Sequence, residues 1–223
     1  RDPRWPGAVG VAAAAAAGRA VFAQRCFQHG PKPPAARICR MPPADTLHPI
    51  SLATAAVLTG RSMRTWQRRI EEGAVPRLGD GRGALVPFAA VRPALALDLT
   101  DEDVAMLVRA DQGDAAAQAD VGALFALAAL QEAEAGRGGD ALVAPDAARG
   151  GGSMVAALHF LRQAAQQGQA DAMHWLGVLH AAGLGEGDGQ ALALMWIAKA
   201  AAHGHVIAQQ QLAGLMPGKA SSG

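Results

Sequence analysis

The sequence predicts a mainly α-helical protein, and three observations lead to this fold class. Ala and Gly are abundant, only 4% of the residues are aromatic and Tyr is absent, a composition that disfavours a sheet built from Val, Ile, Tyr and Thr. Two short segments with helix-capping residues follow one another after residue 50, and the C-terminal half contains an internal repeat with helical patterning. The 223 residues are enough for one compact domain or two small ones.

The charges are distributed unevenly, although the formal net charge is only +1. Residues 51–92 contain seven arginines against three acidic residues, whereas residues 98–146 contain eleven acidic residues against two arginines. This asymmetry predicts an anion-binding segment followed by an acidic one. Because no uncharged apolar run of about 18 residues is present, we expect no membrane span and a soluble, cytoplasmic bacterial protein.

Residues 1–47 show no sustained helical or strand period, and we expect them to be disordered. The favoured interpretation is that Met41 is the true start and that the preceding residues are translated upstream sequence. An export signal with cleavage near Ala23 is the competing interpretation, and it would make the chain an exported repeat protein. Both cysteines, Cys26 and Cys39, lie in this segment, which excludes a disulfide scaffold for the folded part.

Residues 48–96 have the pattern of a small winged helix-turn-helix domain. Ser51 is placed to cap a first helix, and Gly60 is able to end it. The residues expected to face inward on this helix are Leu52, Ala56 and Val57. Two short strands, at 74–78 and 84–87, are expected around a Gly-rich turn and would form the wing. Residues 88–95 are then expected to form a small helix that closes the core.

A second helix is expected over residues 63–72, capped by Ser62 and closed by Gly73. Met63, Trp66 and Ile70 are expected to form its buried stripe. The opposite face is cationic and suits the major groove of DNA, where guanidinium groups pair with guanine edges or phosphates. Together with the following turn, the residues expected to contact DNA are Arg61, Ser62, Arg64, Thr65, Arg68, Arg69, Arg77 and Arg82.

This order of caps, helices and turns resembles the MerR and excisionase-like superfamily of winged DNA-binding modules. The resemblance is carried by residues 51–58, 61–70 and 73–76. It implies sequence-directed DNA binding, and a homodimer is expected because such modules commonly bind paired half-sites. The chain lacks the metal-binding cysteine set and the long dimerisation helix of full-length MerR-type regulators, so metal sensing is not implied.

Residues 100–217 contain an internal repeat typical of stacked helix hairpins, which predicts a short α-solenoid. Residues 161–168 match residues 197–204 at an offset of 36, and the register continues into the following helix. An earlier copy around Gly113 lies at a longer offset. The extra residues of this copy, at about 132–153, are expected to form a loop. Thr100 with Asp103 would cap the first helix of the array.

The repeat is similar to the Sel-one-like repeats, which are relatives of the tetratricopeptide repeats. The residues that carry this similarity are Ala172, Leu176, Gly177, Gly183, Ala191, Trp196, Lys199, Ala200, Ala201, Gly204 and Ala208. The resemblance implies adaptor work between proteins, in which a concave surface binds a segment of a partner. It does not identify that partner.

No combination of residues indicates catalysis. The Gly-rich stretch 183–189 follows no strand and falls in an expected interhelix loop, so it does not predict a phosphate site. Ser153 is expected in a loop and not as a nucleophile. The histidines of the repeats lack further ligands at metal-binding spacing and are expected to be structural, namely His174, His180, His203 and His205.

We therefore expect no enzyme, no cofactor and no metal site. The predicted function is that of a transcriptional regulator or accessory factor that binds DNA through its Arg-rich helix and a protein partner through its repeats. The alternative is a protein-protein adaptor whose first domain does not bind DNA. The effect of the arginines on DNA affinity would separate these two hypotheses.

Overall fold

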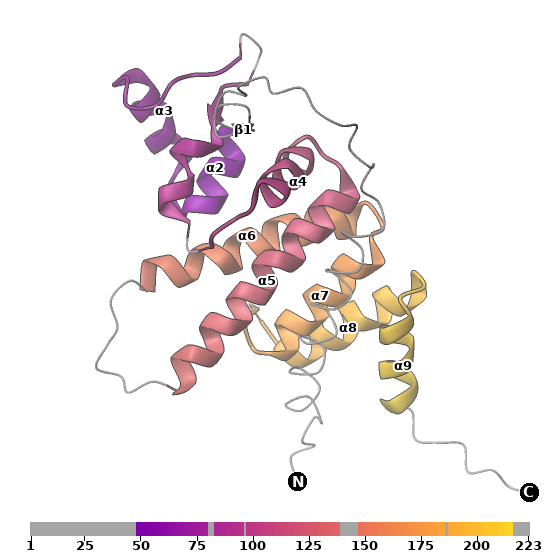
Figure 1. The fold of residues 1–223 in the computed structure, drawn as a ribbon. Coiled ribbons are helices and arrows are strands. Elements are labelled where there is room, and N and C mark those ends of the chain that lie inside the picture. Colours follow the sequence, from indigo (N-terminus) through magenta and orange to yellow (C-terminus); the bar gives the residue numbers. More distant parts are fainter. Residues whose placement is uncertain (1–47, 80–82, 96, 139–146, 186, 216–223) are drawn as a thin grey trace, which may run out of the picture.

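The computed structural model describes residues 48–79, 83–95, 97–138, 147–185 and 187–215. In this part of the chain the protein is mainly helical, as the sequence predicts (Figure 1). The elements are β1 (Pro49–Ser51), α2 (Leu52–Thr59), α3 (Met63–Glu71), β2 (Leu85–Pro87), the 3₁₀ helices η2 (Phe88–Ala90) and η3 (Arg92–Ala94), α4 (Asp101–Asp111), α5 (Ala115–Gly138), α6 (Ala147–Gln166), α7 (Ala170–Ala181), α8 (Gly189–Ala202) and α9 (Val206–Leu215). The expectations for residues 1–47, including the start at Met41, lie outside the described residues.

The first helix, α2, begins and ends where the sequence predicts. The Ser51 hydroxyl accepts a hydrogen bond from the Thr54 amide, and Gly60 ends the helix with φ of 64°. Its inward face differs from the prediction, because the buried apolar residues are Leu52, Ala55 and Leu58. These three side chains follow a spacing of three residues and therefore share one face, whereas Ala56 and Val57 are only partly buried beside it.

The small sheet was only partly predicted. β1 pairs with β2 in an antiparallel arrangement, with Ile50 opposite Val86. The strand expected at 74–78 is reduced to an isolated bridge between Leu78 and Leu85. β1 has three residues and starts with a proline, so it shows no alternation that could have predicted it.

The helix expected at 88–95 is wrong in detail, because this segment forms the two 3₁₀ turns η2 and η3. Pro93 has no amide proton and therefore cannot donate the hydrogen bond that a continuous α-helix would need there. The segment still closes the core, since Phe88 and Val91 are both fully buried.

α4 begins with the predicted capping box, in which the Thr100 side chain and the Asp103 side chain each bond to the other's backbone amide. The loop predicted at 132–153 is wrong at both ends, because α5 continues to Gly138 and α6 already begins at Ala147. Only residues 139–146 of that stretch lie outside the described residues. The last part of α5 and the first part of α6 contact each other, because the buried Ser153 hydroxyl of α6 donates to the Glu132 carboxylate of α5 over 2.9 Å.

The sequence repeat has a structural counterpart in three equivalent turns. Gly113, Gly168 and Gly204 have φ of 95°, 86° and 89°, in the left-handed region that favours glycine. Each glycine amide bonds to the carbonyl three residues earlier, and the next amide bonds to the carbonyl five residues before it. This pair of bonds ends α4, α6 and α8 and starts the following helix in the same geometry.

Glycines also allow the two helices of each hairpin to approach closely. A Cβ atom on Gly122 would lie 2.7 Å from the Leu161 side chain, and one on Gly177 would lie 2.7 Å from Ile197. These are corresponding positions of the α5–α6 and α7–α8 hairpins.

We predict that Gly177→Ala destabilises the protein by about 1–3 kcal/mol, because the added methyl group overpacks the crossing of α7 and α8. The Ala193 carbonyl, only 3.2 Å from the new atom, leaves little room for relaxation. Urea unfolding followed by circular dichroism measures the change. Gly214→Ala in α9 is the matched control, since its methyl group would meet nothing within 4 Å and should be neutral or slightly stabilising. Equal effects of the two substitutions would contradict the close crossing.

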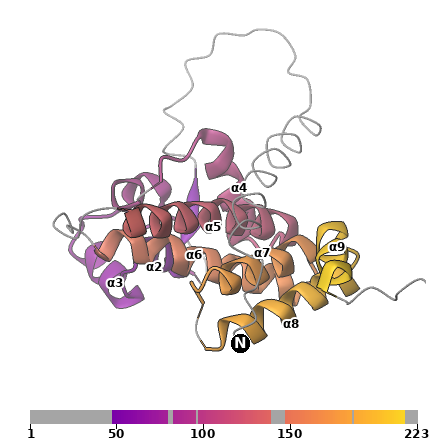
Figure 2. The same cartoon turned by 90° about the horizontal axis from the view of Figure 1, so that it is seen from below.

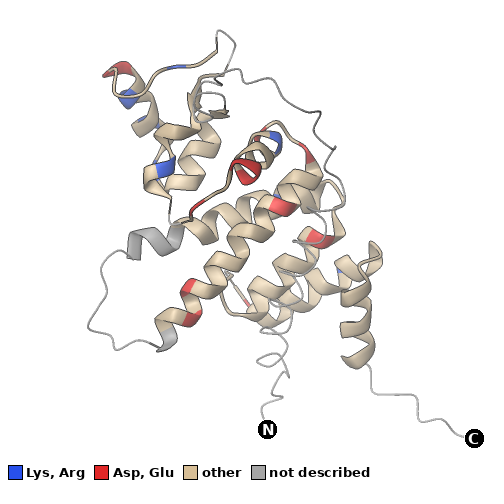
Figure 3. Ribbon diagram, in the orientation of Figure 1, with Lys and Arg blue, Asp and Glu red and all other residues tan. Residues whose placement is uncertain are grey.

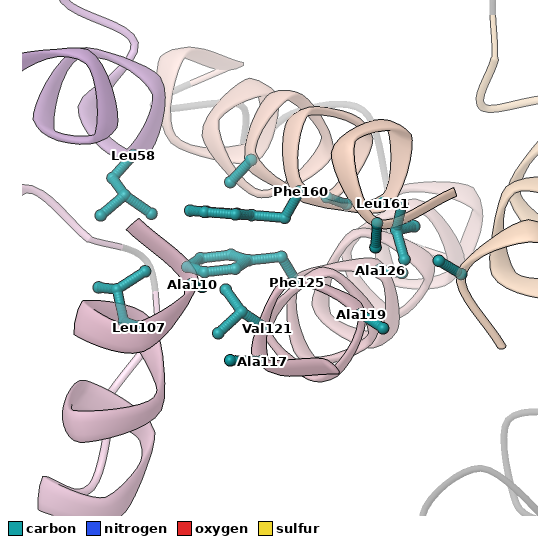
Figure 4. Packing of buried hydrophobic residues seen from close by; sticks show 14 of the residues in the cluster. Leu58, Leu107, Ala110, Ala117, Ala119, Val121, Phe125, Ala126, Phe160 and Leu161 are labelled. Atoms are coloured by element: carbon teal, nitrogen blue, oxygen red, sulfur yellow. The ribbon is translucent and has the colours of Figure 1, made fainter. Parts of the chain in front are cut away.

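The N-terminal elements and the helical repeats share one hydrophobic core. Leu58 of α2 lies with Leu107 of α4, Phe125 of α5 and Phe160 of α6 (Figure 4). Both views of the ribbon place α2 and α3 at one end of the molecule and α9 at the other (Figures 1 and 2). The Arg-rich helix α3 and the repeats therefore belong to one packed body.

Candidate nucleic-acid interface

A buried tryptophan attaches α3 to α2. Trp66 is fully buried, and its indole N–H donates to the Thr59 hydroxyl over 3.2 Å. The Thr59 hydroxyl donates in turn to the Ala55 carbonyl of α2. Since buried indole groups need a hydrogen-bond partner, this chain of bonds defines how α3 lies against α2.

The start of α3 is capped as predicted. The Ser62 hydroxyl accepts from the Thr65 amide over 3.1 Å and lies 2.9 Å from the Thr65 hydroxyl. Both predicted contact residues are thus at the exposed beginning of the helix, with their hydroxyl groups hydrogen-bonded to each other.

The predicted buried stripe of α3 is wrong at its first residue. Trp66 is buried and Ile70 packs partly against the core, but the side chain of Met63 is 48% exposed. Met63 stands in the first turn of α3 next to the exposed residues Arg61 and Ser62, and it is not among the described residues that pack against the core.

The arginines on α3 and just before it are in two different situations. Arg61 and Arg64 are exposed and have no ion-pair partner among the described residues. Arg68 lies 3.5 Å from the Glu72 carboxylate, with both side chains more than half exposed, and the Arg69 guanidinium lies 5.1 Å from the centre of the Trp66 ring. The unpaired positive charges therefore lie at the N-terminal end of α3, where the helix dipole also favours anions.

Two of the residues predicted to contact DNA follow α3, and the structure describes only one of them. Arg77 is exposed on the segment after α3, whereas Arg82 lies outside the described residues. Acidic residues lie mainly on α4 and α5, away from the first turn of α3 (Figure 3). The cationic surface and the acidic one are thus on different elements, as the uneven charge distribution predicts.

A hydrogen-bonded carboxylate that the sequence analysis missed joins the N-terminal elements to α4. Asp111, the last residue of α4, accepts hydrogen bonds from the Ser51 amide at 2.7 Å, from the Ser51 hydroxyl at 2.6 Å and from the Thr54 hydroxyl. These groups lie at the start of α2, so the carboxylate also faces the positive end of that helix. The partners are 60 residues apart in the sequence, and no local pattern could have indicated the contact.

Two of the histidines of the repeats, His174 and His205, have partners within the fold. His174 and His205 stack with ring centres 4.2 Å apart, and the His205 Nδ1 atom accepts from the Ala208 amide at the start of α9. The Nε2 atoms of His174 and His205 lie 3.2 Å from the Gln211 amide oxygen and 3.5 Å from the Asp171 carboxylate, respectively. Burial, with the neighbouring His205, lowers the pKa of His174 to about 4, and burial also lowers the pKa of His205.

We predict that the protein loses about 2 kcal/mol of stability between pH 6.5 and pH 4.5 through His174 and His205. Because their folded-state pKa values are lowered, the unfolded chain binds the extra protons, so stability is full above pH 6.5 and falls as the solution is acidified. Protonated His205 can no longer accept the Ala208 hydrogen bond. Urea midpoints across this range measure the effect, and His174→Gln should reduce it whereas His203→Gln, at an exposed position, should not. A flat profile in the wild type would refute this account.

Other candidate sites have packing roles. The Gly-rich stretch lies between α7 and α8, where a Cβ on Gly185 would be 2.0 Å from the Nδ1 atom of buried His180. Ser153 is helical and buried, which corrects the expectation of a loop. In the described part of the chain there is no group of three or more His, Cys, Asp or Glu placed to hold a metal ion, and no helix is both long and apolar enough to cross a membrane.

Comparisons of the chain with protein-family models, with curated proteins and with solved structures found no match.

Proposed function

We propose that this protein binds DNA through α3 and acts as a transcriptional regulator or accessory factor, with its helical repeats binding a protein partner. The observation that carries the proposal is a pair of exposed arginines, Arg61 and Arg64, at the capped N-terminal end of a helix anchored by Trp66, with no ion-pair partner among the described residues. A helix presented in this way can enter the major groove with its cations on phosphates or guanine edges.

The arrangement of the neighbouring elements supports a winged helix-turn-helix of the MerR and excisionase-like type. α2 and α3 are joined by a short turn, and Leu78 forms an antiparallel bridge with Leu85. Arg77 is exposed just before this bridge and would contact the DNA backbone next to the groove that α3 occupies. The equivalent glycine turns and close helix crossings of α5–α9 support a short Sel-one-like α-solenoid.

The proposal predicts a salt-dependent DNA affinity that depends on Arg61 and Arg64. Neutralising about four phosphates gives a log-log slope of about −3.6, and Arg61→Ala with Arg64→Ala should flatten it by about two units. Fluorescence anisotropy with a labelled duplex from the region upstream of its own gene, over a salt series, measures both slopes.

The matched control is Arg162→Ala with Lys199→Ala, which removes the same charge from exposed positions on α6 and α8. This control variant should keep the wild-type slope. If the two double variants and the wild type bind equally weakly, α3 does not bind DNA.

The second candidate function is that of a protein-protein adaptor. It is favoured by two adjacent exposed apolar side chains on α8, Leu194 at 44% and Met195 at 37% exposure, since such a pair has no role in the core of this chain. Unchanged DNA affinity after removal of Arg61 and Arg64 would favour the adaptor function over DNA binding.

A further inference from the structure

Met63 is an exposed apolar residue inside a cationic surface. It is the only large hydrophobic side chain of described residues 48–99 that is classed as exposed, and its neighbours Arg61, Ser62 and Arg64 are exposed as well. Trp66, three residues later and next to Met63 on the helix surface, is buried against α2, whereas Met63 is not among the described residues that pack against the core. An apolar side chain among cations suits a surface that offers both phosphates and an apolar group.

Gln67 lies one helical turn after Met63 on the same side of α3. Its side chain is exposed, and its amide group has no hydrogen-bond partner among the residues that the structure describes. Met63 and Gln67 are uncharged, Glu71 follows them on the same side at the C-terminal end of α3, and the neighbouring side is formed by Arg64 and Arg68. Met63 and Gln67 carry no charge to pair with phosphates, so these two exposed side chains are available for base edges.

The major groove presents chemically matching groups. The thymine methyl group is the apolar feature of the groove, and adenine N6 and N7 form the donor-acceptor pair that a glutamine amide binds with two hydrogen bonds. One helical turn rises about 5.4 Å, which corresponds to one or two base steps.

We infer that Met63 and Gln67 select the DNA sequence, with Met63 contacting a thymine methyl group and Gln67 bonding to adenine one or two base steps away. The preferred DNA then carries A·T pairs beside the phosphates bound by Arg61 and Arg64. This inference rests on the proposed DNA-binding function and adds to it the base composition of the target.

Selection from a pool of randomised duplexes tests the inference with the full chain. Wild type and the control Met195→Ala, which removes an exposed methionine on α8, should recover duplexes that share A·T pairs at two positions one or two base steps apart. Met63→Ala and Gln67→Ala should each lose the preference at one position while keeping their affinity for unselected duplexes.

Single-atom changes in the recovered duplex then assign the contacts. Deoxyuridine in place of thymidine removes the methyl group and should weaken wild-type binding about fourfold, but Met63→Ala less than about twofold. Deoxy-7-deazaadenosine removes N7 and should weaken wild-type binding about fivefold, but Gln67→Ala less than about twofold.

The possible outcomes separate this inference from the function on which it rests. Salt-dependent DNA binding without a recurrent A·T pair, or variants that respond to the modified bases as strongly as the wild type, would overturn the inference and leave the DNA-binding function standing. No salt-dependent binding to any duplex would overturn both. Coupled losses at both modified bases support the inference.

Discussion

Trp66→Ala should destabilise the protein by about 3–5 kcal/mol, the largest effect expected from any single substitution in the N-terminal elements. The indole is fully buried, its N–H donates to Thr59, and its ring lies beneath the Arg69 guanidinium. Removing it leaves a cavity between α2 and α3 and an unpaired Thr59 hydroxyl. Urea unfolding followed by circular dichroism measures the loss.

Trp66→Phe is the control for this substitution, because it keeps most of the buried area and removes only the indole hydrogen bond. It should cost about 1–2 kcal/mol. A loss below about 1 kcal/mol for Trp66→Ala would show that α3 is not packed on α2 through this residue. Since α2 also packs on α6, unfolding of the variant should remain a single transition.

Asp111→Ala should destabilise the protein by about 3–4 kcal/mol. Three donors of β1 and α2 lose a charged acceptor, and each such hydrogen bond contributes about 1.5–3 kcal/mol before partial solvation of the site is taken into account. Asp111→Asn should be less damaging, because its amide oxygen can still accept from the Ser51 amide while its NH₂ group donates to the Ser51 and Thr54 hydroxyls, which can rotate to accept. Thermal and urea unfolding measure both variants.

Asp98→Ala removes an exposed carboxylate just before α4 and serves as the charge-matched control. It should change the free energy of unfolding by less than about 0.5 kcal/mol. If Asp111→Ala behaved like this control, the N-terminal elements would not be joined to the repeats through this carboxylate.

The sequence by itself determined the elements that depend on local chemistry. Ser51, Ser62 and Thr100 cap helices through hydrogen bonds that span three residues, so the pattern needs no distant partner. Gly113 and Gly204 mark turns that require a positive φ, which other residues rarely adopt. The same local signals placed the Arg-rich helix and the repeat register.

The tertiary structure decided features that depend on groups far apart in the chain. β1 exists because it pairs with β2, and the ends of α5 and α6 are helical through stretches whose glycines predict a loop. The exposure of Met63 depends on which side chains pack on α3, and the role of Asp111 depends on a helix start 60 residues earlier. Helix caps and turns are short-range interactions, whereas strand pairing, burial and buried hydrogen bonds are formed only when distant segments pack together.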